Sequence, residues 1–305
     1  MYKQITANRQ KTFWLILIFL LVLIGVGYAA SIYWDTPSIL FWAVLVSVGM
    51  SWWSYFAGDK AILALSGARE VRYDVALKET QIVHLVENLC LTAGLPLPKI
   101  FLITDPAPNA FAVGRDPQHA SIALTTGIVE KLTKVELEGV IAHELAHVKN
   151  YDILLSTVVV TLLGVIVLIA DWMGRASMGI SPRGAKASFG QRDDNQQNNG
   201  ALAIIAVIFL ILAPIFARLI YLAISRQREY LADASGALLT RYPEGLAEAL
   251  EKLTADRHQL RLANRATAGL YIVNPFKKTG TIIEEALSTH PPLAKRIAAL
   301  RSMNL

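Results

Sequence analysis

Two long uncharged segments at the start of the chain constrain its fold more than any other feature. Residues 13–34 and 36–58 contain no charged side chain and are rich in aliphatic and aromatic residues. A helix needs about 20 apolar residues to cross a hydrocarbon core of about 30 Å, so each segment is long enough to span a bilayer. No small-residue cleavage site follows the first segment. We therefore predict that residues 1–58 form a transmembrane hairpin that is retained as an anchor.

The composition of the whole chain agrees with a membrane protein. Hydrophobic residues make up 54% and charged residues only 17%, a balance that is unusual for a soluble domain. We interpret the modest net charge of +5 as lysines and arginines that face anionic lipid, so no nucleic-acid partner is expected. The single cysteine, Cys90, excludes an internal disulfide and a cysteine-based zinc site.

The cations that flank the two apolar segments predict their orientation. They lie before the first segment and after the second, and the short link between the segments has none: Lys3, Arg9, Lys11, Lys60, Arg69 and Arg72. Because cytoplasmic loops are enriched in Lys and Arg, both flanks are expected in the cytoplasm.

Two further apolar segments, residues 153–170 and 201–225, follow later in the chain. We predict that both span the membrane, which gives about four transmembrane helices. Pro214 and Arg218 interrupt the second of them, and buried core helices are the alternative. The polar residues 171–200 between them are predicted to form a flexible loop. This loop contains four cations: Arg175, Arg183, Lys186 and Arg192. If both segments span the membrane, the loop lies on the non-cytoplasmic side, against the positive-inside rule, unless the two segments form a shallow hairpin.

The remaining segments, residues 59–152 and 226–305, are typical of a water-soluble domain in two parts, with the second membrane hairpin (153–225) between them. In the first part the apolar pattern predicts a helix over 77–92 and strands over 99–104, 109–114 and 120–125. A capping-box pattern, Thr133 with Glu136, predicts the start of a helix over 133–150, and residues 226–305 are predicted to be mostly helical. The fold class is therefore a mainly α membrane protein with a cytoplasmic α+β domain.

The motif His143-Glu144-Leu145-Ala146-His147 lies inside the predicted helix over 133–150. Residues four apart share one helix face, so both imidazoles can bind one metal ion. Catalytic zinc takes three protein ligands and leaves a position for water, and Glu144 is placed to accept a proton from that water. By chance the pattern arises in roughly one such chain in two hundred, so it needs support from a third ligand.

Glu229 is the third ligand that the sequence suggests. It lies four residues before Asp233, so both carboxylates face one side of a helix. Glu229 would complete a His2Glu zinc site and Asp233 would orient a histidine ligand; alternatively, Glu229 only pairs with Arg226. If the third and fourth apolar segments form a hairpin, His147 and Glu229 stand about 9 and 7.5 Å from the ends of those segments, at similar heights.

These features together resemble the HtpX heat-shock family of membrane zinc metalloproteases, relatives of the CAAX prenyl endopeptidases. The resemblance rests on the two N-terminal segments and on motifs at residues 109–112, 143–152, 226–233 and 289–293. It implies a zincin-like (gluzincin) domain with one zinc ion, held by His143, His147 and Glu229, and Glu144 as the general base. It also implies a stress-response endopeptidase that cleaves misfolded or damaged membrane proteins at the cytoplasmic face of the bacterial inner membrane.

The resemblance assigns two further groups of residues. Asn109, Ala110, Phe111 and Ala112 match a segment beside the cleft, where an edge strand would pair with an extended substrate; the alternative is a buried strand that follows an Asn turn. His290 and Arg296 match positions that face the developing oxyanion in the prenyl proteases; the alternative is a helix cap. Asp152 is either a helix-end contact or a partner of the histidine helix.

Two other functions are weighed against the protease. A membrane scaffold with a structural zinc needs no general base, so the presence of Glu144 argues against it. A small transporter needs polar residues along several membrane segments, and apart from Arg218 these segments contain almost no ionisable residue.

Overall fold

The computed structural model describes residues 2–71, 77–177, 226–262, 267–274 and 291–303. Its helices are α1 (Tyr2–Tyr33), α2 (Ser38–Leu65), α3 (Leu77–Ala93), α4 (Thr126–Lys131), α5 (Lys134–Lys149), α6 (Asp152–Ser177), α8 (Arg226–Thr240), α9 (Pro243–Ala255) and α11 (Leu293–Arg301). Short 3-10 helices lie at Pro117–His119 and Ala268–Leu270. The strands are β1 (Ala68–Glu70), β2 (Lys99–Ile103), β3 (Ala110–Gly114) and β4 (Ala120–Thr125).

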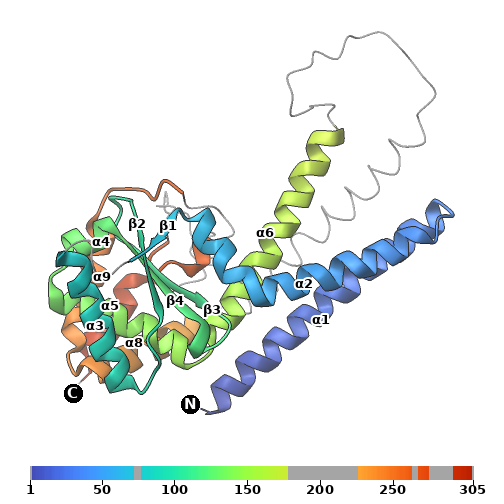
Figure 1. Cartoon of the computed structure of the whole chain (residues 1–305). Helices are drawn as coiled ribbons and strands as arrows, with labels where there is room; N and C mark the ends of the chain where they lie inside the picture. The colour runs from blue at the N-terminus through green and yellow to red at the C-terminus, as the bar shows by residue number, and fades with distance from the viewer. Residues whose placement is uncertain (1, 72–76, 178–225, 263–266, 275–290, 304–305) are drawn as a thin grey trace, which may run out of the picture.

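Helices α1 and α2 form the predicted N-terminal hairpin and project side by side from the domain that contains the sheet (Figure 1). Both are long and apolar enough to cross a membrane, over Gln4–Tyr33 and Ser38–Leu65. Large apolar side chains on these helices are exposed, among them Trp14 at 58%, Phe41 at 62% and Trp52 at 66%. Exposed apolar surface of this extent matches acyl chains better than water.

Helix α6 corresponds to the predicted third membrane segment and packs against the hairpin. Leu154, Val158 and Leu162 of α6 cluster around Phe19 of α1. The part of α6 whose side chains the structure describes, Asp152–Gly164, is apolar but shorter than a membrane span. The structure thus supports two membrane helices and leaves the third as a prediction.

The remaining membrane predictions fall largely outside the described residues. This holds for the fourth apolar segment and for most of the loop predicted over residues 171–200. The start of that loop is corrected by the structure, because α6 continues as a helix to Ser177.

A mixed sheet forms the centre of the domain, with strand order β1-β2-β4-β3. β2 and β4 are parallel, and the other neighbouring pairs are antiparallel. The three strands predicted from the sequence are confirmed, whereas the three-residue β1 was not predicted. β3 is an edge strand of this sheet.

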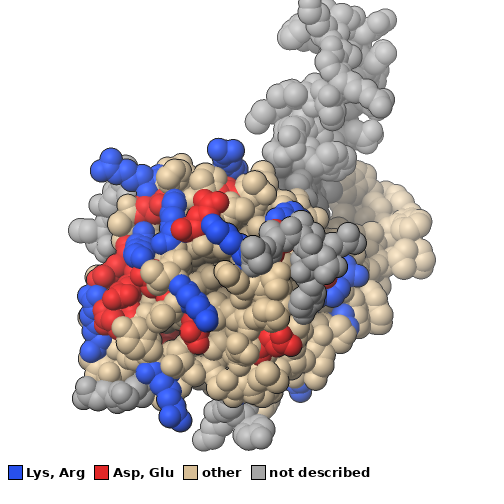
Figure 2. Space-filling model, turned by 60° about the vertical axis from the view of Figure 1, so that its left-hand side comes forward, with Lys and Arg blue, Asp and Glu red and all other residues tan. Residues whose placement is uncertain are grey.

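Helices α3, α5 and α9 bury their apolar faces in one core with the sheet. Val86, Ile122, Val140 and Leu250 in this core have no exposed surface. Charged side chains instead gather on the outside of the domain, as Figure 2 shows for one face. This division of apolar and charged residues is that of a water-facing domain attached to membrane helices.

Candidate metal centre

The start of α5 fixes where the two histidines lie. The predicted capping box is present: Thr133 Oγ1 accepts from the Glu136 backbone N–H at 3.4 Å, and Glu136 Oε2 accepts from the Thr133 N–H at 2.7 Å. From this cap the helical repeat brings His143 and His147 to one face. Their side chains are 1% and 16% exposed.

The structure brings the three predicted ligands together, with one ligand atom of each within 4.8 Å of the others. His143 Nε2 lies 3.2 Å from His147 Nε2. The Glu229 carboxylate oxygens lie 3.9 Å from His143 Nε2 and 3.7 Å from His147 Nε2. Ligands about 2.0–2.1 Å from a tetrahedral zinc ion are themselves roughly 3.4 Å apart. The spacing of these atoms therefore fits one zinc-sized ion.

Glu229 reaches the histidines because α8 packs very closely on α5. At Gly236 of α8 an added Cβ would meet the backbone N of His143 at 3.0 Å and the carbonyl carbon of Ala142 at 3.2 Å. Only glycine leaves room for this approach without a shift of the backbone. One turn before Gly236 lies Asp233, and one turn before that Glu229, so both carboxylates face α5.

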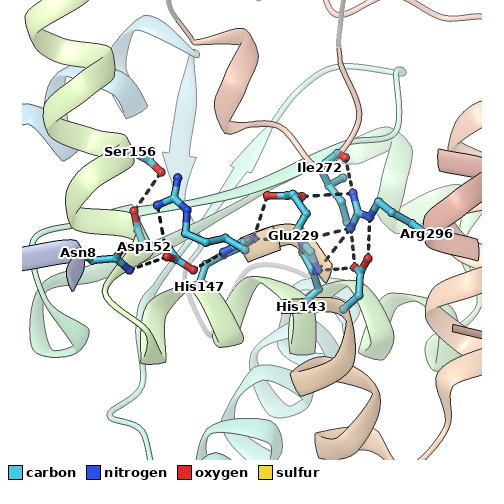
Figure 3. A network of polar contacts seen from close by, with 10 residues as sticks. Asn8, His143, His147, Asp152, Ser156, Glu229, Ile272 and Arg296 are labelled. Atoms are coloured by element: carbon cyan, nitrogen blue, oxygen red, sulfur yellow. Dashed lines mark hydrogen bonds and ion pairs between the residues drawn. The ribbon is translucent and has the colours of Figure 1, made fainter. Parts of the chain in front are cut away.

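The Nδ1–H of each histidine donates a hydrogen bond to a buried carboxylate (Figure 3). His143 Nδ1 lies 2.9 Å from Asp233 Oδ1, and His147 Nδ1 lies 2.9 Å from Asp152 Oδ2. A hydrogen on Nδ1 leaves the Nε2 lone pair available for a metal ion. The two carboxylates thus select the tautomer that a metal site requires, and Asp152 is a partner of the histidine helix as well as the first residue of α6.

Glu144 lies beside the three ligands in a small buried cavity. The cavity has a volume of about 30 Å³ and is lined by residues that include Ala112, His147, Glu229 and Ile272, so it holds about one or two water molecules. Burial raises the pKa of Glu144 to about 7, although the charge of His147 and a hydrogen bond from the Ala112 backbone favour the carboxylate. A carboxyl group with such a pKa can both accept and release a proton near neutrality.

The surroundings of the site favour positive charge. Glu144, Asp152, Glu229 and Asp233 are all at most 5% exposed. Burial lowers the pKa of His147, but the hydrogen bond to Asp152 and the charge of Glu229 outweigh it and raise the pKa to about 9. Buried carboxylates in this number need cationic partners, and a divalent cation among them meets that need.

Arg296 is fully buried on the side of the centre opposite Asp152 (Figure 3). Its Nε donates to Asp233 Oδ2 at 2.8 Å and its Nη2 to Asp233 Oδ1 at 2.6 Å. Its Nη1 lies 3.3 Å from both Glu229 Oε2 and the Ile272 carbonyl. The guanidinium therefore contacts the carboxylates that hold the centre, and its predicted action on an oxyanion stays a prediction.

Within the predicted substrate strand, three residues make contacts inside the protein and one lines the cavity. Asn109 is bonded to the segment that follows the second 3-10 helix: its Nδ2 donates to the Val273 carbonyl at 2.8 Å, and the Ile272 N–H donates to the Ala110 carbonyl at 3.0 Å. Phe111 is buried and packs edge-on against Tyr271 at 5.1 Å. Ala112 alone of the four residues lines the cavity beside Glu144.

Other parts of the site lie outside the described residues or were not found in the sequence. His290 is among the residues that the structure does not describe. Asn8 and Arg228 both contact Asp152 and were not recognised. Arg228 stands inside the motif around Glu229, whereas the signal for Asn8 is a polar side chain close to a membrane segment.

Histidines four apart on one helix, a glutamate from a second helix and a buried glutamate beside them define a metallopeptidase centre. Residues 76–304 match the model of peptidase family M48. A protein described as "Protease HtpX homolog" from Dictyoglomus turgidum is 41% identical over 303 residues, which cover 99% of this chain and 94% of that protein. A second protein with the same description, from Thermoanaerobacter pseudethanolicus, is 40% identical over 311 residues, which cover 100% of this chain and 98% of that protein.

The chain belongs to peptidase family M48, among its HtpX-type proteases, and is a metalloprotease. The resemblance noted in the sequence is thereby confirmed. A crystal structure of Ste24p from S. mikatae has the same fold, with a TM-score of 0.51 at 19% identity over 98% of this chain and 67% of that one.

Proposed function

We propose that this chain is a membrane-integral zinc endopeptidase that cleaves misfolded or damaged membrane proteins at the cytoplasmic face of a bacterial inner membrane. One observation carries the proposal. The Nε2 atoms of His143 and His147 converge with the Glu229 carboxylate, while each Nδ1 is bound to a buried carboxylate. This arrangement serves a metal ion and has no evident use without one.

The residues of the centre then have separate roles. His143, His147 and Glu229 hold the zinc, which supplies Lewis-acid polarisation of the scissile carbonyl and a water of lowered pKa. Glu144 accepts the proton of the attacking water on a carboxylate oxygen and releases it to the amide nitrogen of the leaving chain. Asp233 and Asp152 hold the two imidazoles in place.

The position of the centre next to membrane helices supports membrane proteins as substrates. Ile153 and Ser156, in the first two turns of α6, line the cavity. A segment that emerges from the bilayer beside α6 therefore meets the centre directly. Gly269, Leu270 and Ile272 also line the cavity. Pairing of the substrate backbone is proposed for Ala112, where the strand borders the cavity.

Orientation is supported by the cations of the sequence. Figure 1 shows that the first turn of α1 and the last turns of α2 both lie at the sheet-containing domain. These are the ends that Arg9, Lys11, Lys60 and Arg69 flank. The positive-inside rule then places the domain and its centre in the cytoplasm.

Removal of the metal is the direct test of this function. We expect the purified full chain in detergent to contain one zinc per chain and to cleave an unfolded membrane-protein substrate. A strong chelator should reduce cleavage to background, and one equivalent of zinc should restore it, because the zinc would polarise the carbonyl and lower the pKa of the attacking water. Metal analysis and the rate of substrate loss are the measurements. Full activity in metal-free protein would contradict the proposal, as would zinc that stays bound after His143 and His147 are both replaced by Ala.

A further inference from the structure

The first membrane helix reaches the metal centre through one side chain. Asn8 of α1 is 2% exposed. Its Nδ2 donates to Asp152 Oδ1 at 2.7 Å and to the Asn150 carbonyl at 2.9 Å. The other oxygen of the same carboxylate, Oδ2, is bonded to His147 Nδ1 at 2.9 Å. Figure 3 shows this line of contacts, which runs from α1 through Asp152 to His147.

We propose that Asn8 is a positioning residue for the metal ligand His147, and that α1 is for this reason part of the metal centre as well as an anchor. The inference rests on the proposed zinc site. It concerns the orientation of His147 and the affinity of the site for zinc, which the motifs of the protease domain do not specify.

Asn8 fixes the rotation of the Asp152 carboxylate. A carboxylate that is bonded at one oxygen only can turn about its side chain, and the His147 ring turns with it. Arg228 Nη1 also approaches Asp152 Oδ1, but at 3.4 Å, which is beyond the best range for a charge-assisted hydrogen bond. The shorter contact from Asn8 is therefore the stronger constraint on this oxygen. Partners of this kind orient metal ligands and raise their affinity for the ion.

The same turn of α1 holds the backbone that connects the histidine helix to α6. That connection consists of Asn150 and Tyr151 and leads into Asp152, the first residue of α6. Tyr151 has a positive φ of 60°, which is unfavourable for a residue with a side chain. Asn8 binds the carbonyl before Tyr151, and the Arg9 guanidinium lies over the Tyr151 ring at 4.4 Å. Two adjacent residues of α1 thus stabilise a strained turn whose last residue is the partner of His147.

Replacement of Asn8 by Ala in the full chain tests the proposal through zinc affinity. We expect zinc to dissociate about tenfold more readily in competition with a chromophoric chelator, at the low end of the range for partners of metal ligands. The visible spectrum of the cobalt-substituted protein should also change, because the spectrum reports the geometry of the imidazole ligands. Asn8→Leu, which keeps the volume and has no donor, should behave in the same way and serves if the Ala variant does not fold.

Thr12→Val is the matched control. Thr12 is also buried at 2%, lies one turn further along α1 and bonds to the Asn8 carbonyl within its own helix. It should leave zinc affinity and the cobalt spectrum unchanged. In the background of Asp152→Asn, which weakens zinc binding by itself, removal of the Asn8 side chain should weaken it less than in the wild type, because the contact through the Asp152 carboxylate is already altered and only the bond to the Asn150 carbonyl is unchanged.

The outcomes separate this inference from the proposed function. A wild-type chain that binds no zinc at His143, His147 and Glu229 removes the proposed function and this inference with it. A wild-type chain that binds zinc, with Asn8 variants that match Thr12→Val in affinity and in cobalt spectrum, overturns the role of Asn8 alone. The role of Asn8 is also overturned if Asn8→Ala has the same effect with and without the Asp152 carboxylate. Such a result indicates that the Asn8 side chain acts only through packing around it.

Discussion

Glu144→Gln is expected to lower kcat/KM for peptide-bond cleavage by about a thousandfold, within the range for loss of a general acid–base group. The amide has the shape of the carboxyl group but cannot accept a proton from water. Glu144 is buried and lines the cavity with the three ligands, so no bulk water can replace it. Zinc content and melting temperature should stay at the wild-type values, because Glu144 is not among the converging ligand atoms. Single-turnover cleavage of an unfolded membrane protein measures the loss.

Glu138→Gln is the control for this experiment. Glu138 is on the same helix and only half-buried, five residues before His143, which places it on the opposite face of α5. Its replacement removes an equal charge and should leave the rate unchanged. If Glu144→Gln cleaves as fast as the wild type, Glu144 does not activate the water. If the wild type itself binds zinc and cleaves nothing, the scaffold with a structural zinc becomes the better explanation.

The parts of the site that were predictable from the sequence are those set by local geometry. The capping box at Thr133 and the helical repeat place His143 and His147 on one face without any knowledge of the tertiary fold. Glu229 and Asp233 follow from the same repeat on a second helix. β3 lies at the edge of the sheet, as expected for the predicted substrate strand. The sequence pattern of this strand does not predict the pairing of Asn109 with Val273. That pairing joins residues far apart in the chain and carries no periodic signal.

The connections between distant segments were not predictable. For Asp152 the sequence left two roles open, and its contact with His147 depends on a sharp turn at Tyr151. Tyr151 adopts a positive φ although nothing in its residue type favours it. Asn8 is 144 positions from Asp152, and its neighbours in sequence indicate only the start of a membrane helix. For Arg296 the resemblance supplied the residue, whereas its contacts with Asp233 and Glu229 depend on how α11 packs against α8.

Arg296→Met is expected to destabilise the protein by about 3–5 kcal/mol, the usual effect when one partner of a buried ion pair is removed. The guanidinium is fully buried and binds Asp233 through two hydrogen bonds, with Glu229 3.3 Å away. Without it, His143 is the partner left to Asp233 among the described residues, in a site that already has an excess of carboxylates. The melting temperature of the zinc-loaded protein in detergent measures the effect. Zinc affinity should fall as well, because Asp233 and Glu229 lose the group that holds them.

Arg301→Met is the matched control, since Arg301 lies on the same helix and binds Glu244 and Glu251. Its side chain is 44% exposed, so water replaces the lost contacts and little change in melting temperature is expected. Addition of Asp233→Asn to Arg296→Met should restore part of the lost stability, because the uncompensated carboxylate is then gone.

The alternative role of Arg296, on the developing oxyanion, predicts a different pattern. A group that acts only in the transition state changes kcat and leaves melting temperature and zinc affinity unaltered. Arg296→Lys separates the two roles, because lysine keeps the charge but loses the planar pair of hydrogen bonds to Asp233. A role in holding the carboxylates requires that the lysine variant melts earlier and binds zinc more weakly. A lysine variant with wild-type stability and zinc affinity but a reduced kcat would assign Arg296 to the oxyanion instead.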